Sequence, residues 1–285
     1  MRRIFIGAII AAMLVCAPAW AAGDKEDQVL ATPFTALISF GDSFSDNGFA
    51  DGHGFKRYCE AWTWVEYLAQ MLNLPHDNHA WGGAMSDDRN CNHAEGVRWS
   101  GLNWQVDEYV KSLDKGQDIS KVLFTVMCGS NDVWLDITDG KVSAGNIRQA
   151  MANLAKAGAR HIVYRETPAA LMAPGYLDGK YASYSEPWAK LVNDTNAITR
   201  KELVAGFKKE FPEVTIYYME SDPLFTKIKN GDEGFKFEIH DKAWWGTYSL
   251  PEPGKYVWYD EWHPTSFVHK LIAEDSVEVL KKSVK

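Results

Sequence analysis

The chain has 285 residues, of which 46% are hydrophobic and 24% charged, proportions typical of a globular protein with a sizeable core. Its formal net charge of −8 at pH 7 argues against nucleic acid as a partner, because nucleic-acid-binding surfaces are basic. The same negative charge gives no electrostatic attraction to an anionic membrane surface.

The first predicted element is a secretory signal peptide over residues 1–21. Two arginines precede an apolar run over residues 4–16, and a small-x-small cleavage site ends at Ala21. The run is too short to span a bilayer well, so we expect cleavage after Ala21 and secretion to the periplasm or the extracellular medium. A lipid anchor on Cys16 is the alternative, which the Leu-Val pair before it disfavours. Cleavage would leave 28 basic residues against 38 acidic ones, a charge of −10.

Strand and helix patterns alternate along the rest of the chain. Short apolar or β-branched runs predict strands over residues 35–40, 78–81, 122–127, 161–164 and 214–218. Apolar residues at helical spacing predict helices around residues 64–72, 102–110, 147–154, 188–207 and 267–272. Gly158 should close the third helix as a left-handed cap, and Ser185 and Pro187 should start the fourth. This alternation predicts a parallel sheet covered on both faces, and residues 22–285, without repeat or linker, are predicted to form one domain.

The first strand runs into Gly41-Asp42-Ser43. In α/β sheets, ligands bind outside the carboxyl ends of the strands, so Ser43 is a candidate nucleophile. Taken alone, this polar stretch is also typical of a turn with a helix cap. An ordinary α/β-hydrolase is excluded, because its Gly-x-Ser-x-Gly elbow would need glycine where Ser45 stands.

Other strand ends carry groups that suit acyl transfer. Gly82-Gly83 follows the second strand, Asn131 follows the third, and Asp260 and His263 stand near the C-terminus. A histidine can take the proton of a serine nucleophile, and a carboxylate can hold the imidazole tautomer. An asparagine amide and backbone N–H groups are the usual donors to an oxyanion. Each group alone is commonly a turn or a cap, but their joint occurrence in this order is seldom due to chance.

The cysteines after the leader are Cys59, Cys91 and Cys128. Cys128 ends an apolar strand and is expected to be a buried free thiol. Cys59 and Cys91 lie in polar loops, and export permits a disulfide, so they are the predicted pair. A zinc site of Cys59, Cys91 and His93 is an alternative that the ligand spacing supports poorly, and no metal is predicted.

Together these blocks resemble the GDSL esterases and lipases, also called SGNH hydrolases, over nearly the whole predicted mature chain. The matching blocks are Phe40–Gly48, Asn78–Ala84, Gly129–Asp132 and Asp260–Thr265. The resemblance implies Ser43 as nucleophile, with Asp260 and His263 completing a triad. It also implies an oxyanion hole from Ser43, Gly83 and Asn131. The implied fold is a three-layer, flavodoxin-like α/β fold with a five-stranded parallel sheet in the order 2-1-3-4-5, without cofactor. Glu166-Thr167-Pro168 departs from the family's more usual Leu-Pro stretch.

The secreted bacterial members that the chain resembles most are phospholipases, lysophospholipases and glycerophospholipid acyltransferases. The resemblance therefore implies a fatty-acyl lipid ester as substrate, with transient contact to a lipid interface. Eleven of the twelve tryptophans follow the leader, and loop tryptophans can line an acyl groove, although any single one is more often core. One alternative is a carbohydrate acetylesterase, because sugars also stack on tryptophan. The other is a non-catalytic glycan- or lipid-binding module, which the complete set of five site residues disfavours.

Overall fold

The computed structural model describes residues 32–48, 53–94, 96–177, 179–232, 234–245 and 252–283. The predicted signal peptide lies outside these residues. A five-stranded parallel sheet in the order β2-β1-β3-β4-β5 forms the centre, which confirms the predicted fold. Its strands are β1 (Ala36–Gly41), β2 (His76–Asn78), β3 (Val122–Met127), β4 (His161–Arg165) and β5 (Thr215–Met219).

The central strand pair brings two predicted site residues to one edge of the sheet. All six residues of β3 are buried, as expected for a continuous apolar run covered on both faces. Gly41, the last residue of β1, pairs with Met127, the last residue of β3. Ser43 and Asn131 therefore leave neighbouring strands at the same carboxyl edge.

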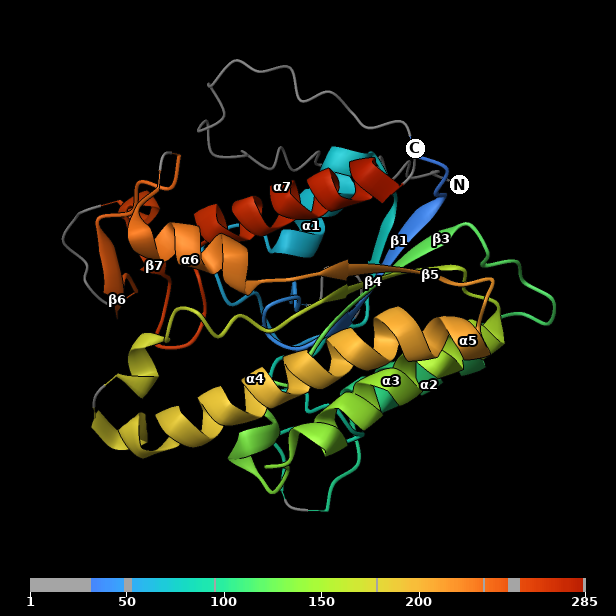
Figure 1. Cartoon of the computed structure of the whole chain (residues 1–285), viewed down its shortest axis with the longest axis horizontal. Helices are drawn as coiled ribbons and strands as arrows, with labels where there is room; N and C mark the ends of the chain where they lie inside the picture. Colours follow the sequence, from blue (N-terminus) through green and yellow to red (C-terminus); the bar gives the residue numbers. More distant parts are fainter. Residues whose placement is uncertain are drawn as a thin grey trace, which may run out of the picture.

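Helices cover both faces of the sheet, so the domain has three layers (Figure 1). On one face lie α1 (Trp64–Leu72), α6 (Asp222–Asn230) and α7 (Ser266–Ser283). On the other lie α2 (Leu102–Ser112), α3 (Gly140–Ala157) and α4 (Ser185–Lys201). A π-helical stretch (Glu202–Phe207) and α5 (Lys208–Glu210) continue α4. Across the described ranges, no helix combines the length and apolar character needed to cross a bilayer.

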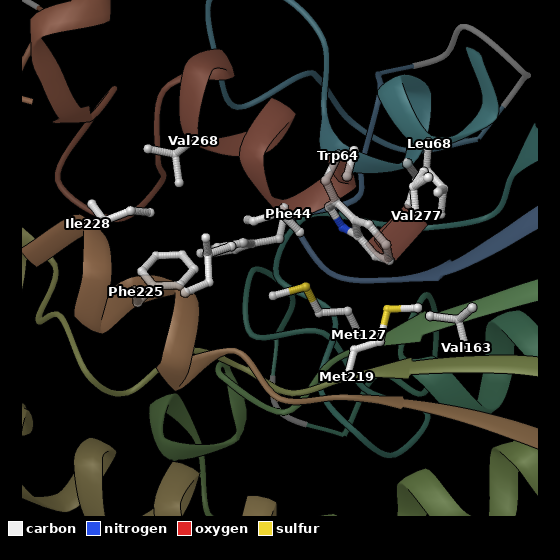
Figure 2. Packing of buried hydrophobic residues seen from close by; sticks show 14 of the residues in the cluster. Phe44, Trp64, Leu68, Met127, Val163, Met219, Phe225, Ile228, Val268 and Val277 are labelled. Carbon is white, nitrogen blue, oxygen red and sulfur yellow. The ribbon is translucent and has the colours of Figure 1, made fainter. Parts of the chain in front are cut away.

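The core between the sheet and the first helical layer holds the residue after Ser43 in place. Phe44 is buried in this core together with Trp64 of α1, Met127 of β3 and Phe225 of α6 (Figure 2). Burying an aromatic side chain of this size contributes about 1.5–3 kcal/mol. The turn that carries Ser43 is therefore anchored by the apolar core on its C-terminal side.

Several element boundaries differ from the predictions. β2 ends at Asn78, where the sequence pattern placed a strand start, and β5 begins one residue later than expected. Tyr184 is the N-cap of α4, so Ser185 opens the helix, and its hydroxyl donates backwards to the Ala182 carbonyl. The helix α6 was not predicted, because only three apolar side chains mark its buried face. Gly158 does cap α3, with a φ of 116°.

A second, two-stranded sheet precedes the last helix. It pairs β6 (Ile239–Ala243) with β7 (Tyr256–Trp258). It was also not predicted, because the sequence shows here only an aromatic segment rich in glycine and proline. Its importance is positional, because β7 leads directly into the segment that carries Asp260 and His263.

Candidate active site

Three predicted site residues form one continuous hydrogen-bonded chain. The Nε2 atom of His263 lies 2.8 Å from the Oγ atom of Ser43, and its Nδ1 atom lies 2.8 Å from both carboxylate oxygens of Asp260. With Nδ1 protonated toward Asp260, Nε2 is free to accept the Ser43 hydroxyl proton. Ser43 and His263 are only 7% and 8% exposed, so the contact is largely shielded from solvent. This is the arrangement that activates a serine nucleophile.

A tight turn after β7 places Asp260 and His263. The Tyr259 N–H donates to the His263 carbonyl, and the Thr265 N–H donates to the Val257 carbonyl. The Oδ1 atom of Asp260 also accepts the backbone N–H groups of Trp262 and His263, each at 2.8 Å. Burial alone would raise the pKa of Asp260, but the hydrogen bond and charge of His263 and these N–H groups outweigh it and lower the pKa. Asp260 therefore stays ionised beside the imidazole.

The predicted oxyanion residues line the same cavity as Ser43 and His263. Gly83 has a φ of 79°, and a Cβ there would lie 2.1 Å from the Asn92 Nδ2 atom, so only glycine fits. Asn131 precedes a short 3-10 turn (Asp132–Trp134), but its side chain makes no cap hydrogen bond. Its Nδ2 atom donates instead to the Ala84 carbonyl at 3.0 Å. The amide is thus held next to Gly83, and both residues line the cavity.

Two buried carboxylates, which the sequence pattern did not identify as important, support these turns. Asp42 accepts the Phe44 N–H at 3.1 Å and the Ser130 hydroxyl at 2.9 Å, and so joins the nucleophile turn to the Asn131 turn. Asp132 accepts the N–H and the hydroxyl of Ser86, both at 2.7 Å, and the Ser143 hydroxyl. Burial raises the pKa of Asp42 and of Asp132 to about 6. The sequence could have pointed to both carboxylates, because Asp42 lies in the first matching block and Asp132 in the third.

The raised pKa of Asp132 predicts a measurable pH dependence of stability. A carboxyl whose pKa is about 6 in the folded protein binds protons more tightly than the unfolded chain, so its contribution to the unfolding free energy rises as the pH falls below about 6. Between about pH 7.5 and about pH 5, this single group should add on the order of 1 kcal/mol to the free energy of unfolding. Urea unfolding of wild type and of Asp132→Asn at both pH values measures this contribution of Asp132 to the free energy of unfolding. If the free energy of unfolding depended on pH equally in the two proteins, the predicted contribution of Asp132 would be wrong.

The predicted Cys59–Cys91 disulfide is wrong, because the structure holds Cys59, Cys91 and Cys128 as free cysteines. The Cys59 thiol is buried and points to the Ala61 carbonyl at 3.6 Å. Cys91 is held beside Gly83 by a backbone hydrogen bond and lines the cavity. Burial raises the pKa of Cys91 to about 12. Loop character alone does not determine which thiols meet, whereas the expectation of a free, buried Cys128 is confirmed.

The cavity has a volume of about 460 Å³ and a largely aromatic wall. Beyond Ser43 and His263 it is lined by Trp134, Tyr176, Tyr181, Trp188, Trp258 and Trp262. The rings support one another: Trp262 packs edge-on against Tyr176 and Tyr181, with centroid distances of 4.9 and 5.2 Å. Such a wall offers apolar surface next to the nucleophile, and polar groups such as Ser130 and Thr167 lie beside it.

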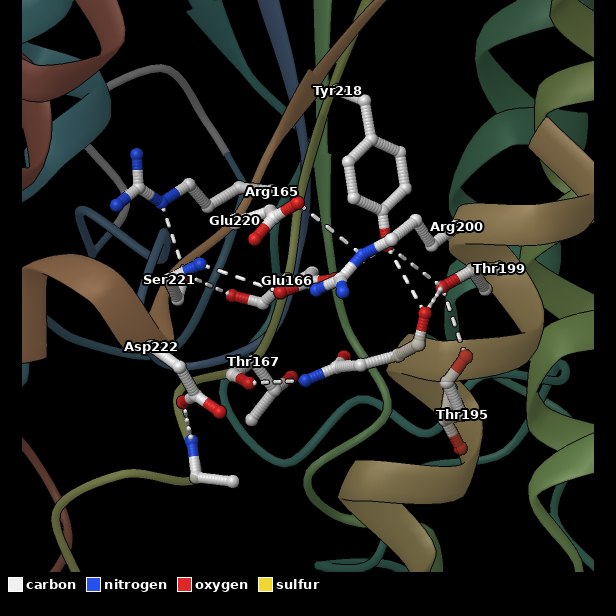
Figure 3. Close-up of polar contacts among 12 residues, drawn as sticks. Arg165, Glu166, Thr167, Thr195, Thr199, Arg200, Tyr218, Glu220, Ser221 and Asp222 are labelled. Atoms are coloured by element: carbon white, nitrogen blue, oxygen red, sulfur yellow. Dashed lines mark hydrogen bonds and ion pairs between the residues drawn. The ribbon is translucent and has the colours of Figure 1, made fainter. Parts of the chain in front are cut away.

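A polar network surrounds the buried Glu166, where the chain departs from the family pattern (Figure 3). Glu166 accepts the Tyr218 hydroxyl at 2.6 Å and an Arg200 N–H at 2.8 Å. The next carbonyl, that of Thr167, accepts the Asn196 amide at 2.9 Å. Thr167 and Pro168 line the cavity, so the role of this unusual stretch is to fix part of the wall against α4 and β5.

The family described as GDSL-like Lipase/Acylhydrolase matches residues 37–276. The thermolabile hemolysin of Vibrio parahaemolyticus is 24% identical over 274 residues, which are 85% of this chain and 63% of that relative. The chain therefore spans less than two thirds of that relative's length.

Two solved structures are similar in outline. A member of the lipolytic protein G-D-S-L family from Veillonella parvula has a TM-score of 0.49 at 15% identity and covers 87% of this chain and 99% of its own. A carbohydrate acetylesterase family member from Sinorhizobium meliloti has a TM-score of 0.49 at 13% identity and covers 88% of this chain and 99% of its own.

Proposed function

We propose that this chain, which belongs to the GDSL-like lipase/acylhydrolase family, cleaves fatty-acyl esters of phospholipids or lysophospholipids. Membership of this family makes the chain a carboxylic ester hydrolase. We assign Ser43 as the nucleophile, His263 as the base and Asp260 as its partner. The observation that carries this is the hydrogen-bonded chain of these three side chains, which opens onto the aromatic cavity. We also propose that the protein is exported and that its signal peptide is cleaved after Ala21.

The geometry supports an acyl-enzyme mechanism. The Ser43 oxygen attacks the ester carbonyl while its proton passes to His263 Nε2. The resulting oxyanion is met by the N–H groups of Ser43 and Gly83 and by the Asn131 amide. When the tetrahedral intermediate collapses, His263 returns the proton to the leaving alcohol. Water then attacks the acyl-enzyme by the same route and releases the fatty acid. An alcohol acceptor in place of water would give acyl transfer.

The preference for a fatty-acyl chain rests on the cavity wall. Aromatic side chains such as Trp134, Tyr176 and Trp188 line the cavity, and each methylene group of a substrate buried against them contributes about 0.8 kcal/mol. Leu177 and Tyr184, close in sequence to the wall residues Tyr176 and Tyr181, are 49% and 39% exposed. They suit transient contact with a lipid interface. The relative from V. parahaemolyticus is called a hemolysin, a name that accords with action on membrane lipid.

The expected result is a kcat/KM at least about 10-fold higher on lysophosphatidylcholine than on acetylated xylan, because two buried methylene groups already contribute a factor of this size. Tyr181→Ala, which shortens the wall without touching Ser43, should lower the ratio of decanoate to acetate turnover on p-nitrophenyl esters. Faster turnover of acetylated xylan would favour a carbohydrate acetylesterase. Binding of either substrate without turnover would favour the non-catalytic module.

A further inference from the structure

A second group of functional side chains lies outside the catalytic cavity. His53, Asp77 and His79 each offer a ligand atom, and these atoms all lie within 4.8 Å of one another. Among the residues that the structure describes, these three form the group with metal-ligand spacing, whereas Cys59, Cys91 and His93 do not. Of the described residues that line the cavity around Ser43, none belongs to this group.

Local structure explains how the three side chains come together. Asp77 lies in β2 and His79 just after it, and alternate residues of an extended chain point to the same side. The Nε2 atom of His79 lies 2.9 Å from the Asp77 carboxylate. His53 reaches the pair from the loop between β1 and α1, and its ring packs on the His79 ring with 4.3 Å between centroids.

The candidate ligands differ in burial, since His79 is buried and Asp77 is partly exposed. His79 is buried, and its ring packs against Phe40 and Tyr109 at centroid distances of 5.4 and 5.3 Å. The Asp77 side chain is 47% exposed, so solvent and ions reach the group. The group therefore joins a buried imidazole, held by ring contacts, to a carboxylate and a loop histidine that are only partly buried.

We propose that His53, Asp77 and His79 bind one divalent transition-metal ion, with Zn²⁺ as the best match. Two imidazoles and one carboxylate suit zinc and its neighbours, whereas Mg²⁺ and Ca²⁺ prefer oxygen ligands alone. Zinc bonds of about 2.0–2.2 Å in a tetrahedron place ligand atoms about 3.4 Å apart, and the three ligand atoms here lie within 4.8 Å of one another. Water completes the coordination.

The bound ion joins the loop after Ser43 to the edge of the sheet. Two residues after His53, the Phe55 N–H donates to the Asp46 carboxylate at 2.9 Å. The same loop carries Tyr58, which lines the catalytic cavity and packs on the His263 ring with 4.6 Å between centroids. The ion therefore has a structural role, because it fastens this loop to β2 without touching the ester.

The test is Zn²⁺ binding to the purified chain without a histidine tag. We expect a stoichiometry of one by calorimetry, and a melting temperature that rises by about 5–10 °C when free Zn²⁺ exceeds Kd by about 100-fold. Bound Co²⁺ should show the visible absorption of a four-coordinate site. His53→Gln and Asp77→Asn should each weaken Zn²⁺ binding by at least about 10-fold, since even groups that only orient ligands contribute that much.

The matched control is His240→Gln, because His240 lies in β6, away from the group, and contacts the Phe237 carbonyl. It should bind Zn²⁺ like wild type. His53→Gln and Asp77→Asn alter partly exposed side chains, so their folding without metal can be checked by melting. Zn²⁺ binding of wild-type strength in both variants, or no binding by wild type, would overturn the proposal and leave a hydrogen-bonded polar group.

Discussion

Ser43→Ala is expected to remain folded and to lose esterase activity by a factor of about 10⁴–10⁶. The Ser43 hydroxyl lies 2.8 Å from His263 Nε2 at the cavity, and in the proposed mechanism it attacks the ester. Without it no acyl-enzyme forms, and only the weak assistance of the oxyanion donors to water remains. Steady-state kinetics on a p-nitrophenyl ester measure the loss, and thermal melting should stay within a few degrees of wild type.

Covalent labelling gives an independent check of this nucleophile. An organophosphonate should modify Ser43, as located by mass spectrometry. Ser45 is the internal control, because its hydroxyl is buried and accepts the Trp64 indole N–H at 3.1 Å. Label on another serine, or full activity of Ser43→Ala, would refute the assignment of the nucleophile.

Asn131→Ala should lower kcat by roughly 10²–10³, about 2.7–4 kcal/mol of transition-state stabilisation, with KM little changed. The Asn131 amide is held by the Ala84 carbonyl at 3.0 Å and lines the cavity with Ser43 and Gly83. A donor directed at the oxyanion acts mainly in the transition state, because charge develops there.

The structure argues against the alternative that the Asn131 side chain serves as a helix cap. The Asn131 side chain makes no cap hydrogen bond, so the loss of about 1 kcal/mol that follows removal of a cap is not expected. Asn131→Asp keeps the size of the side chain but removes the donor, and should be impaired as strongly as the alanine variant. A reduced melting temperature with nearly normal kcat would show that Asn131 serves stability rather than chemistry.

Local sequence patterns predicted most of the architecture. The buried strand β3 and the αL cap at Gly158 are read from neighbouring residues, because apolar runs and backbone conformation are local properties. The start of α4 was misplaced, since Ser185 and Pro187 are compatible with more than one helix position. The short helix α6 and the β6–β7 pair were missed because their sequence signals are weak and their stability comes from packing.

The sequence by itself determined which residues carry the proposed chemistry, because Ser43, Gly83, Asn131, Asp260 and His263 stand in characteristic blocks. Only the tertiary structure decided which side chains meet. His263 contacts Ser43 across 220 positions, a contact made by the sheet order and the turn after β7. The same dependence on distant segments left Cys59 and Cys91 unpaired and brought His53 to Asp77 and His79. Proximity between loops is set by the packing of the whole domain, which no local pattern encodes.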